Sequence, residues 1–180
     1  MKKIINESGV AFGEFNSDDL FYIEESDLYK SLGTGIKTVE FIVLDQKDTI
    51  IFLEAKTGCP NPQNKEMGGE KTEKFVEFYN DISEKFIDSL QIYIAGLLEK
   101  YGKTEEIGEN LMKVKPLEKK KLKFVLVITA DEIKEEWLWG PKLELENRLL
   151  KLRKIWGISV IVLNKSLAYN YGLLSDSKEI

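Results

Sequence analysis

Hydrophobic and polar positions divide the first part of the chain into short extended segments and a β-hairpin. Residues 37–44 and 49–56 are rich in Val, Ile and Phe and flank a polar run, residues 45–48, which is typical of a hairpin. Residues 9–16 and 20–25 are predicted to be extended. A short helical turn is predicted just after them, at residues 28–32.

One long amphipathic helix is predicted from about residue 72 to residue 101. Hydrophobic residues recur there at steps of three and four, and acidic residues occupy the opposite side. The hydrophobic stripe consists of Phe75, Tyr79, Ile82, Phe86, Leu90, Ile94, Leu97 and Tyr101. Residues 57–70, between the hairpin and this helix, are rich in turn-forming residues and are predicted to be a loop.

The last part of the chain predicts a strand, a helical region and a second strand. Residues 123–129 and 158–163 are continuous apolar runs, typical of buried strands. The sequence from Thr129 to Glu132 resembles a capping box, so a helix is expected to start there and to run to Trp156. A break in that helix is expected at Gly140-Pro141. Strand, helix and strand predict a parallel crossover.

These elements predict an α/β protein with a mixed central sheet and helices on its faces. The chain has 180 residues, of which 43% are hydrophobic and 32% charged. Such a chain fits one globular domain over residues 1–180.

Three charged residues interrupt the hydrophobic strands. Glu40 lies inside the first hairpin run, and Glu54 and Lys56 close the second. Residues two apart in a strand point to the same face, and both faces of the second strand are otherwise apolar. Charges that appear only at the end of such a strand favour a functional site. The alternative is a cross-strand ion pair on a solvent-facing side of the sheet.

The register of the hairpin decides whether the two acids meet. A regular two-residue turn at Gln46-Lys47 would place Glu40 opposite Leu53 and would separate the carboxylates. Glu40 and Glu54 share a face only if the turn holds an odd number of residues or if a bulge intervenes. We expect one of these two arrangements.

Composition excludes several kinds of chemistry. The chain has no histidine, which excludes serine–histidine and cysteine–histidine nucleophile pairs. A single cysteine, Cys59, excludes an intrachain disulfide and is expected to be an inert loop residue. The sequence shows neither a secretory leader nor an apolar run of about 18 residues, so we expect a cytoplasmic protein without a membrane partner.

The net charge of −5 argues against a surface coated with basic patches. One local basic cluster occurs, and it is either a solvated loop or a contact for nucleic acid. It consists of Lys115, Lys119, Lys120, Lys121 and Lys123.

The order of elements, together with Glu40 and the triplet Glu54-Ala55-Lys56, resembles the PD-(D/E)xK nuclease superfamily over roughly residues 20–163. Acidic-x-lysine triplets occur elsewhere in the chain, but only this one ends an apolar strand with a second carboxylate upstream. The resemblance implies a restriction-endonuclease-like αβββαβ core. The chain departs from the family where Val39-Glu40 replaces the usual Pro-Asp.

The resemblance also implies a metal site and its ligands. Glu40, Glu54 and the carbonyl of Ala55 would bind Mg²⁺ or Mn²⁺, and Lys56 would hold or activate the attacking water. Glu25, in preference to Glu24, would supply a further carboxylate. Gln91 on the long helix could touch substrate, although a structural role is preferred. The tryptophans are expected in the core or at an interface and not as base-stacking platforms; they are Trp137, Trp139 and Trp156.

The function implied is metal-dependent hydrolysis of phosphodiester bonds in DNA or RNA, with nucleic acid as the partner. The alternative is a non-catalytic nuclease-fold module for binding or assembly. Its partner would be a protein or a second copy of the chain. The acidic composition favours the second reading, and the intact Glu54-Ala55-Lys56 favours the first.

Overall fold

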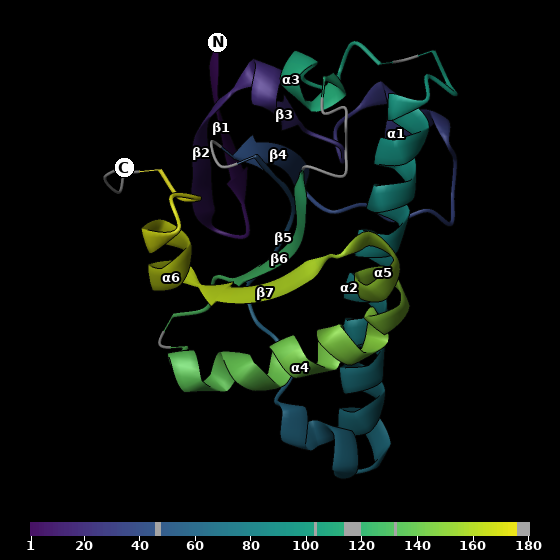
Figure 1. Cartoon of the computed structure of the whole chain (residues 1–180). Coiled ribbons are helices and arrows are strands. Elements are labelled where there is room, and N and C mark those ends of the chain that lie inside the picture. The colour runs from purple at the N-terminus through teal and green to yellow at the C-terminus, as the bar shows by residue number, and fades with distance from the viewer. Residues whose placement is uncertain (46–47, 103, 114–119, 132, 176–180) are drawn as a thin grey trace.

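A computed structural model describes residues 1–45, 48–102, 104–113, 120–131 and 133–175 of the chain. A five-stranded sheet lies at its centre, in the order β3-β4-β5-β6-β7. Helices cover one face of this sheet, and a separate hairpin with a short helix covers the other (Figure 1). The protein therefore belongs to the α/β class with a mixed sheet, as the sequence predicts.

The sheet contains both antiparallel and parallel pairs. β3 (Leu20–Phe21), β4 (Phe41–Asp45) and β5 (Thr49–Lys56) are antiparallel neighbours. β6 (Lys121–Ile128) and β7 (Ser159–Asn164) continue the sheet in parallel. Both the hairpin and the parallel strand pair of the sequence prediction are confirmed.

Two strands and six helices surround this sheet in the part of the chain that the structure describes. β1 (Lys2–Glu7) and β2 (Val10–Asn16) form the separate hairpin. The helices are α1 (Asp27–Ser31), α2 (Gly69–Leu97), α3 (Glu109–Met112), α4 (Trp139–Arg148), α5 (Leu150–Trp156) and α6 (Lys165–Asn170). β1 was not predicted, because its residues are mostly exposed and carry a weak hydrophobic signal.

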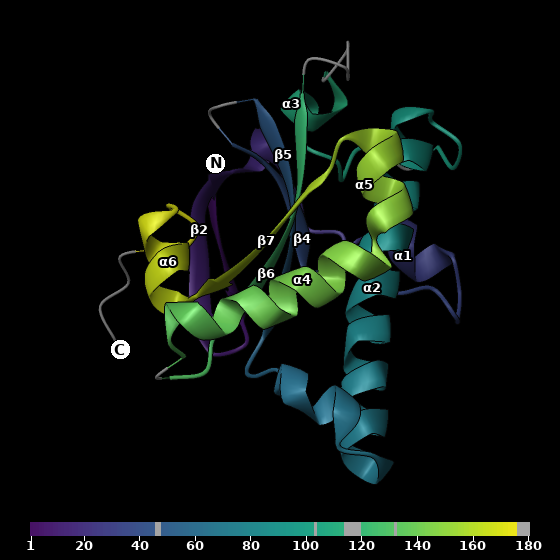
Figure 2. The same ribbon diagram turned by 60° about the horizontal axis from the view of Figure 1, so that its bottom comes forward.

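The long helix α2 packs most of its predicted stripe against the sheet, but it ends at Leu97, and Tyr101 beyond it is 49% exposed. Phe75, Tyr79, Ile82, Phe86 and Leu90 are all buried, in one core with the facing residues of β5 and β6. The ring of Phe86 stacks on that of Phe124, with centroids 4.6 Å apart. Figure 2 shows α4 and α5 crossing the same side of the molecule as α2.

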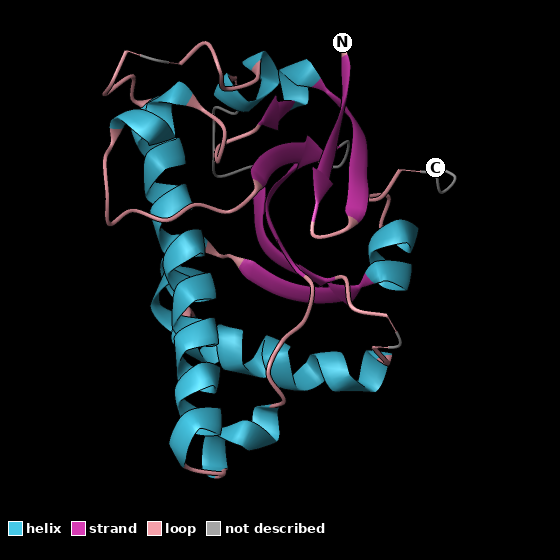
Figure 3. Cartoon of the chain, turned by 180° about the vertical axis from the view of Figure 1, so that it is seen from behind, coloured by secondary structure: helices cyan, strands magenta, loops and turns pink. Residues whose placement is uncertain are grey.

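The opposite face of the sheet packs on the β1–β2 hairpin and α6 (Figure 3). Ile5 and Phe12 from the hairpin and Ala168 from α6 are buried there, together with Leu53 and Ala55 of β5. Both faces of β5 are therefore covered. This agrees with the strand's hydrophobic residues at both odd and even positions.

The helical region after β6 differs from the sequence prediction. The hydroxyl of Thr129 donates to the carbonyl oxygen of Ser8 (2.5 Å) and caps no helix, and Glu132 lies outside the described residues. The first α-helix of this region begins only at Trp139, so Pro141 occupies its first turn. A proline is tolerated there because that amide has no helical acceptor. The break expected at Gly140-Pro141 is thus wrong, and the two helices meet at Leu149 instead.

The tryptophans are surface residues, so of their two expected places the core is wrong, and the interface stays a prediction. Trp137 is 62% exposed, Trp139 is 68% exposed and Trp156 is 39% exposed. Among the described helices, none is long and apolar enough to cross a membrane.

Candidate active site

The β4–β5 register brings Glu40 and Glu54 to one face of the sheet. Asp45 pairs with Thr49, so residues 46–48 separate the two strands, and Phe41 pairs with Leu53. The amide of Glu40, one residue before this ladder, donates to the carbonyl oxygen of Leu53 (3.0 Å). The charges of Glu54 and of Lys85 on α2 both act on the Glu40 carboxylate, so this side chain lies near that of Glu54 on the side of the sheet that faces α2. The expected odd number of residues between the strands is confirmed.

Glu54 is a carboxylate inside the hydrophobic core, with 0% of its surface exposed. Its Oε1 accepts from Nζ of Lys56 (2.9 Å) and from Nζ of Lys85 on α2 (2.8 Å). Its Oε2 is buried and has no hydrogen-bond partner among the described residues. Burial raises the pKa of Glu54, and the two neighbouring lysines act against that rise.

A second group of carboxylates adjoins Glu40. One oxygen each from Glu7, Glu24 and Glu40 lie within 4.8 Å of one another. Burial raises the pKa of Glu40 to about 9, with further contributions from a hydrogen bond with Glu24 and from the negative charge of Glu54. Glu40 therefore holds a proton at neutral pH. A cation among these oxygens would replace that proton.

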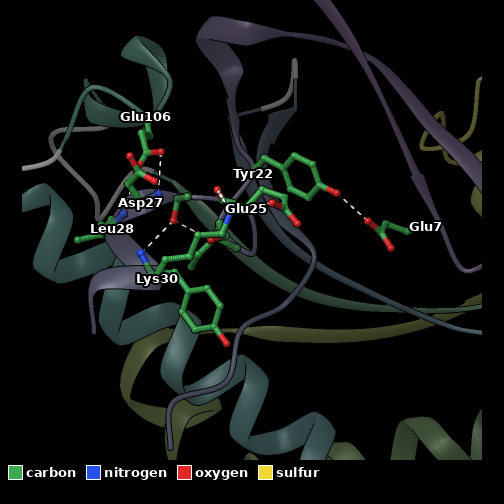
Figure 4. Close-up of polar contacts among 10 residues, drawn as sticks. Glu7, Tyr22, Glu25, Asp27, Leu28, Lys30 and Glu106 are labelled. Atoms are coloured by element: carbon green, nitrogen blue, oxygen red, sulfur yellow. Dashed lines mark hydrogen bonds and ion pairs between the residues drawn. The ribbon is translucent and has the colours of Figure 1, made fainter. Parts of the chain in front are cut away.

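Hydrogen bonds hold Glu7 and the helix that follows Glu24. The hydroxyl of Tyr22 donates to Oε1 of Glu7 (2.7 Å; Figure 4). The next helix, α1, begins directly after Glu24 and Glu25. Its N-terminal amides at Asp27 and Leu28 donate to the two carboxylate oxygens of Glu106, at 2.9 and 3.0 Å.

Glu24, and not Glu25, joins the site, which corrects the sequence-based preference. The carboxylate of Glu25 pairs with Nζ of Lys30 (2.8 Å) at the surface. The extended conformation expected for residues 20–25 holds only for β3, because residues 23–25 form a turn, and in this turn Glu24 is the residue that lies beside Glu40. Glu7 was missed altogether, because nothing in the local pattern indicates that the β1–β2 turn reaches the end of β5.

The carbonyl of Ala55, the expected third metal ligand, accepts a hydrogen bond from Oγ of Ser8 (3.1 Å). Ser8 belongs to the turn between β1 and β2, so this contact also brings Glu7 to the site. A carbonyl oxygen has two lone pairs, so one acceptor position remains at Ala55.

The α2 residue at the site is Lys85 and not Gln91. Gln91 is exposed, and it lies six residues further along the helix. Lys85 precedes Phe86 and follows Ile82 by three positions, so it borders the predicted apolar stripe. A lysine at such a position was a usable signal in the sequence, and it was overlooked.

Two more α2 residues hold the segment that leads into β4. Oδ2 of Asp88 accepts from the amide of Lys37 (3.0 Å), and Oγ of Ser89 accepts from the amide of Val39 (2.8 Å). Val39 immediately precedes Glu40. The helix α2 therefore holds the backbone next to Glu40 through Ser89, and it holds the side chain of Glu54 through Lys85.

An open groove of about 870 Å³ runs beside α2 and reaches Lys56. Its acidic lining residues are Glu73, Glu77, Asp81 and Glu84. Lys37, also in the groove, pairs with Asp81 (2.9 Å) and with Glu84 (2.8 Å). Three lysines, Lys37, Lys56 and Lys74, line the groove as well, so its four acidic residues leave a net charge of only −1.

The described part of the basic cluster lies far from the site. Lys121 pairs with Thr49 at the start of β5, whereas Glu54 lies near its end. The five residue steps from Thr49 to Glu54 span about 17 Å at roughly 3.3 Å each. Lys120 pairs with Asp48, and Lys115 and Lys119 lie outside the described residues.

The single cysteine, Cys59, is partly buried in the loop after β5. Burial raises the pKa of its thiol to about 11, in agreement with an inert residue.

Comparison with known proteins gives no relative for this chain. No family model matches it, and no curated protein and no solved structure shows a significant match. Functional inference therefore depends on the geometry of the site itself.

Proposed function

We propose that this protein is a metal-dependent nuclease that hydrolyses phosphodiester bonds in DNA or RNA. The observation that carries the proposal is the meeting of Glu40 and Glu54 on neighbouring strands, with Lys56 paired to Glu54 at the end of β5. Two carboxylates and a lysine at one end of a sheet are the groups that such hydrolysis requires.

The order of elements supports a restriction-endonuclease-like core. Three antiparallel strands are followed by a long helix and a parallel strand, which is the order that the resemblance implies. One difference is that α1 lies between β3 and β4, whereas the implied core begins with a helix.

The donor atoms suit a hard divalent cation such as Mg²⁺ or Mn²⁺. Glu40 and Glu54 offer carboxylate oxygens, Ala55 offers a carbonyl oxygen, and Glu24 and Glu7 lie beside Glu40. The buried Oε2 of Glu54 has no partner among the described residues, so it is available as a ligand. A bound cation would lower the pKa of a water molecule and offset charge on the phosphate.

Lys56 is the residue of this group best placed to meet a substrate. Its side chain is 31% exposed, and it lines the groove beside α2. From there its ammonium group would hold the attacking water or a phosphate oxygen. Because the chain has no histidine, lysine, carboxylates and water must carry the protons.

A second candidate function is a nuclease-fold module for binding or assembly. The net charge of −5 favours it, because nucleic-acid phosphates are repelled by an acidic protein. The partner would be a basic protein surface or a second copy of the chain. In either case we propose that the protein acts in the cytoplasm.

Cleavage assays on single- and double-stranded DNA and RNA test the proposal. The parent protein should cleave with Mg²⁺ or Mn²⁺ and lose all activity in a chelator. Glu54→Gln should abolish both Mn²⁺ binding and cleavage, whereas Glu136→Gln, which changes an exposed acid before α4, should change neither. Mn²⁺ binding without cleavage of any substrate would favour the binding module. A parent protein that binds no Mn²⁺ at millimolar concentration would contradict both the enzyme and the metal site.

A further inference from the structure

Lys85 and Lys56 contact the same oxygen of Glu54 from different elements. Nζ of Lys85 lies 2.8 Å from Oε1, and Nζ of Lys56 lies 2.9 Å from it. The side chain of Lys85 is only 14% exposed, against 31% for Lys56. Lys85 is therefore the interior partner of Glu54, and Lys56 is the partner at the rim.

The two lysines also differ in how firmly their backbones are held. Lys85 lies within α2, next to Phe86, whose ring stacks on Phe124 of the sheet. Lys56 is the last residue of β5 and is followed by a loop. Core packing thus fixes the backbone of Lys85. The side chain of Lys56 instead faces the open groove beside α2.

The role of Lys56 in binding water or phosphate requires its ammonium group to turn away from Glu54. If Lys56 were the sole partner, this movement would leave a fully buried carboxylate unpaired. An unpaired buried charge is strongly unfavourable. With Lys85 in place, Glu54 keeps a charged hydrogen-bond donor throughout.

The same turn of α2 also holds the strand opposite Glu54. Ser89 follows Lys85 by four residues, which is about one helical turn, and it accepts from the amide of Val39 beside Glu40. One turn of the helix therefore contacts both the carboxylate of Glu54 and the backbone next to Glu40.

We propose that Lys85 is a positioning residue that holds the Glu54 carboxylate in place and thereby frees Lys56 to contact the substrate. The claim that Lys56 contacts the substrate rests on the proposed nuclease function. The claim that Lys85 positions the Glu54 carboxylate does not rest on it, so the two claims can be tested separately.

The hold on Glu54 is tested in metal-free protein by the NMR signal of its side-chain carboxyl carbon. Lys56→Met should leave this signal close to its position in the parent. Lys85→Met should shift and broaden it, and Lys85→Arg should restore most of the parent spectrum. Lys71→Met removes an exposed lysine from the same helix and serves as the control. A parent-like signal in Lys85→Met, or a larger change in Lys56→Met, would overturn the proposal.

Mn²⁺ titration supplies the second measurement. Lys85→Met should weaken Mn²⁺ binding by about tenfold or more, while Lys56→Met should stay within about threefold of the parent. Equal losses in both variants would contradict the assignment. If Lys85→Met does not fold, Lys85→Gln replaces it, because glutamine keeps a hydrogen-bond donor of similar reach. The Lys56→Met spectrum then also tests the proposal, since a large change of the Glu54 signal in that variant would overturn it. A parent that binds no Mn²⁺ would defeat the nuclease function but not the NMR result.

Discussion

The amide of Glu40 donates a hydrogen bond to the carbonyl oxygen of Leu53 at 3.0 Å. Glu40 directly precedes β4, and its buried carboxylate lies near that of Glu54, whose negative charge helps to raise the pKa of Glu40. The segment that enters β4 therefore brings two carboxylates together in a buried space. The proton that Glu40 retains relieves their repulsion.

The first prediction follows from this retained proton. The unfolded chain ionises Glu40 near its ordinary pKa of 4.5, whereas the folded chain does so only at about 9. Within this window the folded state binds more protons, so the contribution of Glu40 to stability falls as pH rises. Glu40→Gln should remove that fall. Urea unfolding at pH 5, 7 and 9 would measure it, with Glu73→Gln as control. An identical pH profile in parent and Glu40→Gln would contradict the prediction.

A second prediction concerns Lys56. Lys56→Met should slow Mg²⁺-dependent cleavage by about 10²–10⁴-fold, the usual effect of losing a group that positions or activates water. Initial rates at saturating cation would measure it. Lys71→Met, which removes an exposed lysine of α2 outside the groove, should cleave at the parent rate. Full activity in Lys56→Met would exclude Lys56 from the reaction.

The third prediction concerns the packing of α2. Phe86 is fully buried and stacks on Phe124, so Phe86→Ala should lower the free energy of unfolding by about 3–5 kcal/mol. Denaturant unfolding would measure this change. Val76→Ala on the exposed side of the same helix should cost far less. A loss below about 1 kcal/mol for Phe86→Ala would mean that the helix packs differently.

A fourth prediction concerns the start of α1. Glu106 accepts from the first amides of this helix, so Glu106→Ala should cost about 1 kcal/mol, as the loss of a helix cap usually does. The neighbouring exposed Glu105 offers a matched control in Glu105→Ala. Because α1 directly follows the segment with Glu24, Mn²⁺ affinity should also fall in Glu106→Ala. Unchanged stability in that variant would show that the cap contributes little.

The fifth prediction uses the exposed tryptophans. Trp137, Trp139 and Trp156 already contact solvent in the folded protein, so tryptophan emission should shift little on unfolding. A neutral quencher should also reach all three in the native state. Strongly blue-shifted native emission would indicate that these rings are covered, for instance by a second copy of the chain.

Local patterns were enough to predict the sheet strands that form the site and the helix that covers them. The period of α2 and the apolar runs of β5, β6 and β7 each follow from residues close in sequence. If Glu40 and Glu54 share a face, the number of residues between β4 and β5 must be odd or a bulge must intervene, so this spacing was also predictable. These are properties of neighbouring residues, and the sequence contains them directly.

The rest of the site depends on contacts between distant segments. Glu7 arrives because the β1–β2 turn meets Ala55, and Glu106 lies 79 residues from the Asp27 amide that it accepts from. The choice between Glu24 and Glu25 is a matter of which way a short segment faces. A single sequence states none of these relationships, because they are set by packing. Lys85 is the exception, since a lysine that borders the apolar stripe of α2 is visible without a structure.

The position of Glu40 beside Glu54 also determines which changes in chain length the site can accept. Side chains alternate along β4, so deleting one residue within Phe41–Asp45 would turn Glu40 to the face of the β1–β2 hairpin or shift the whole strand. Deleting two residues would shorten the strand and return the carboxylate to the face of α2. Insertions and deletions in this strand are thus compatible with the site only in even numbers.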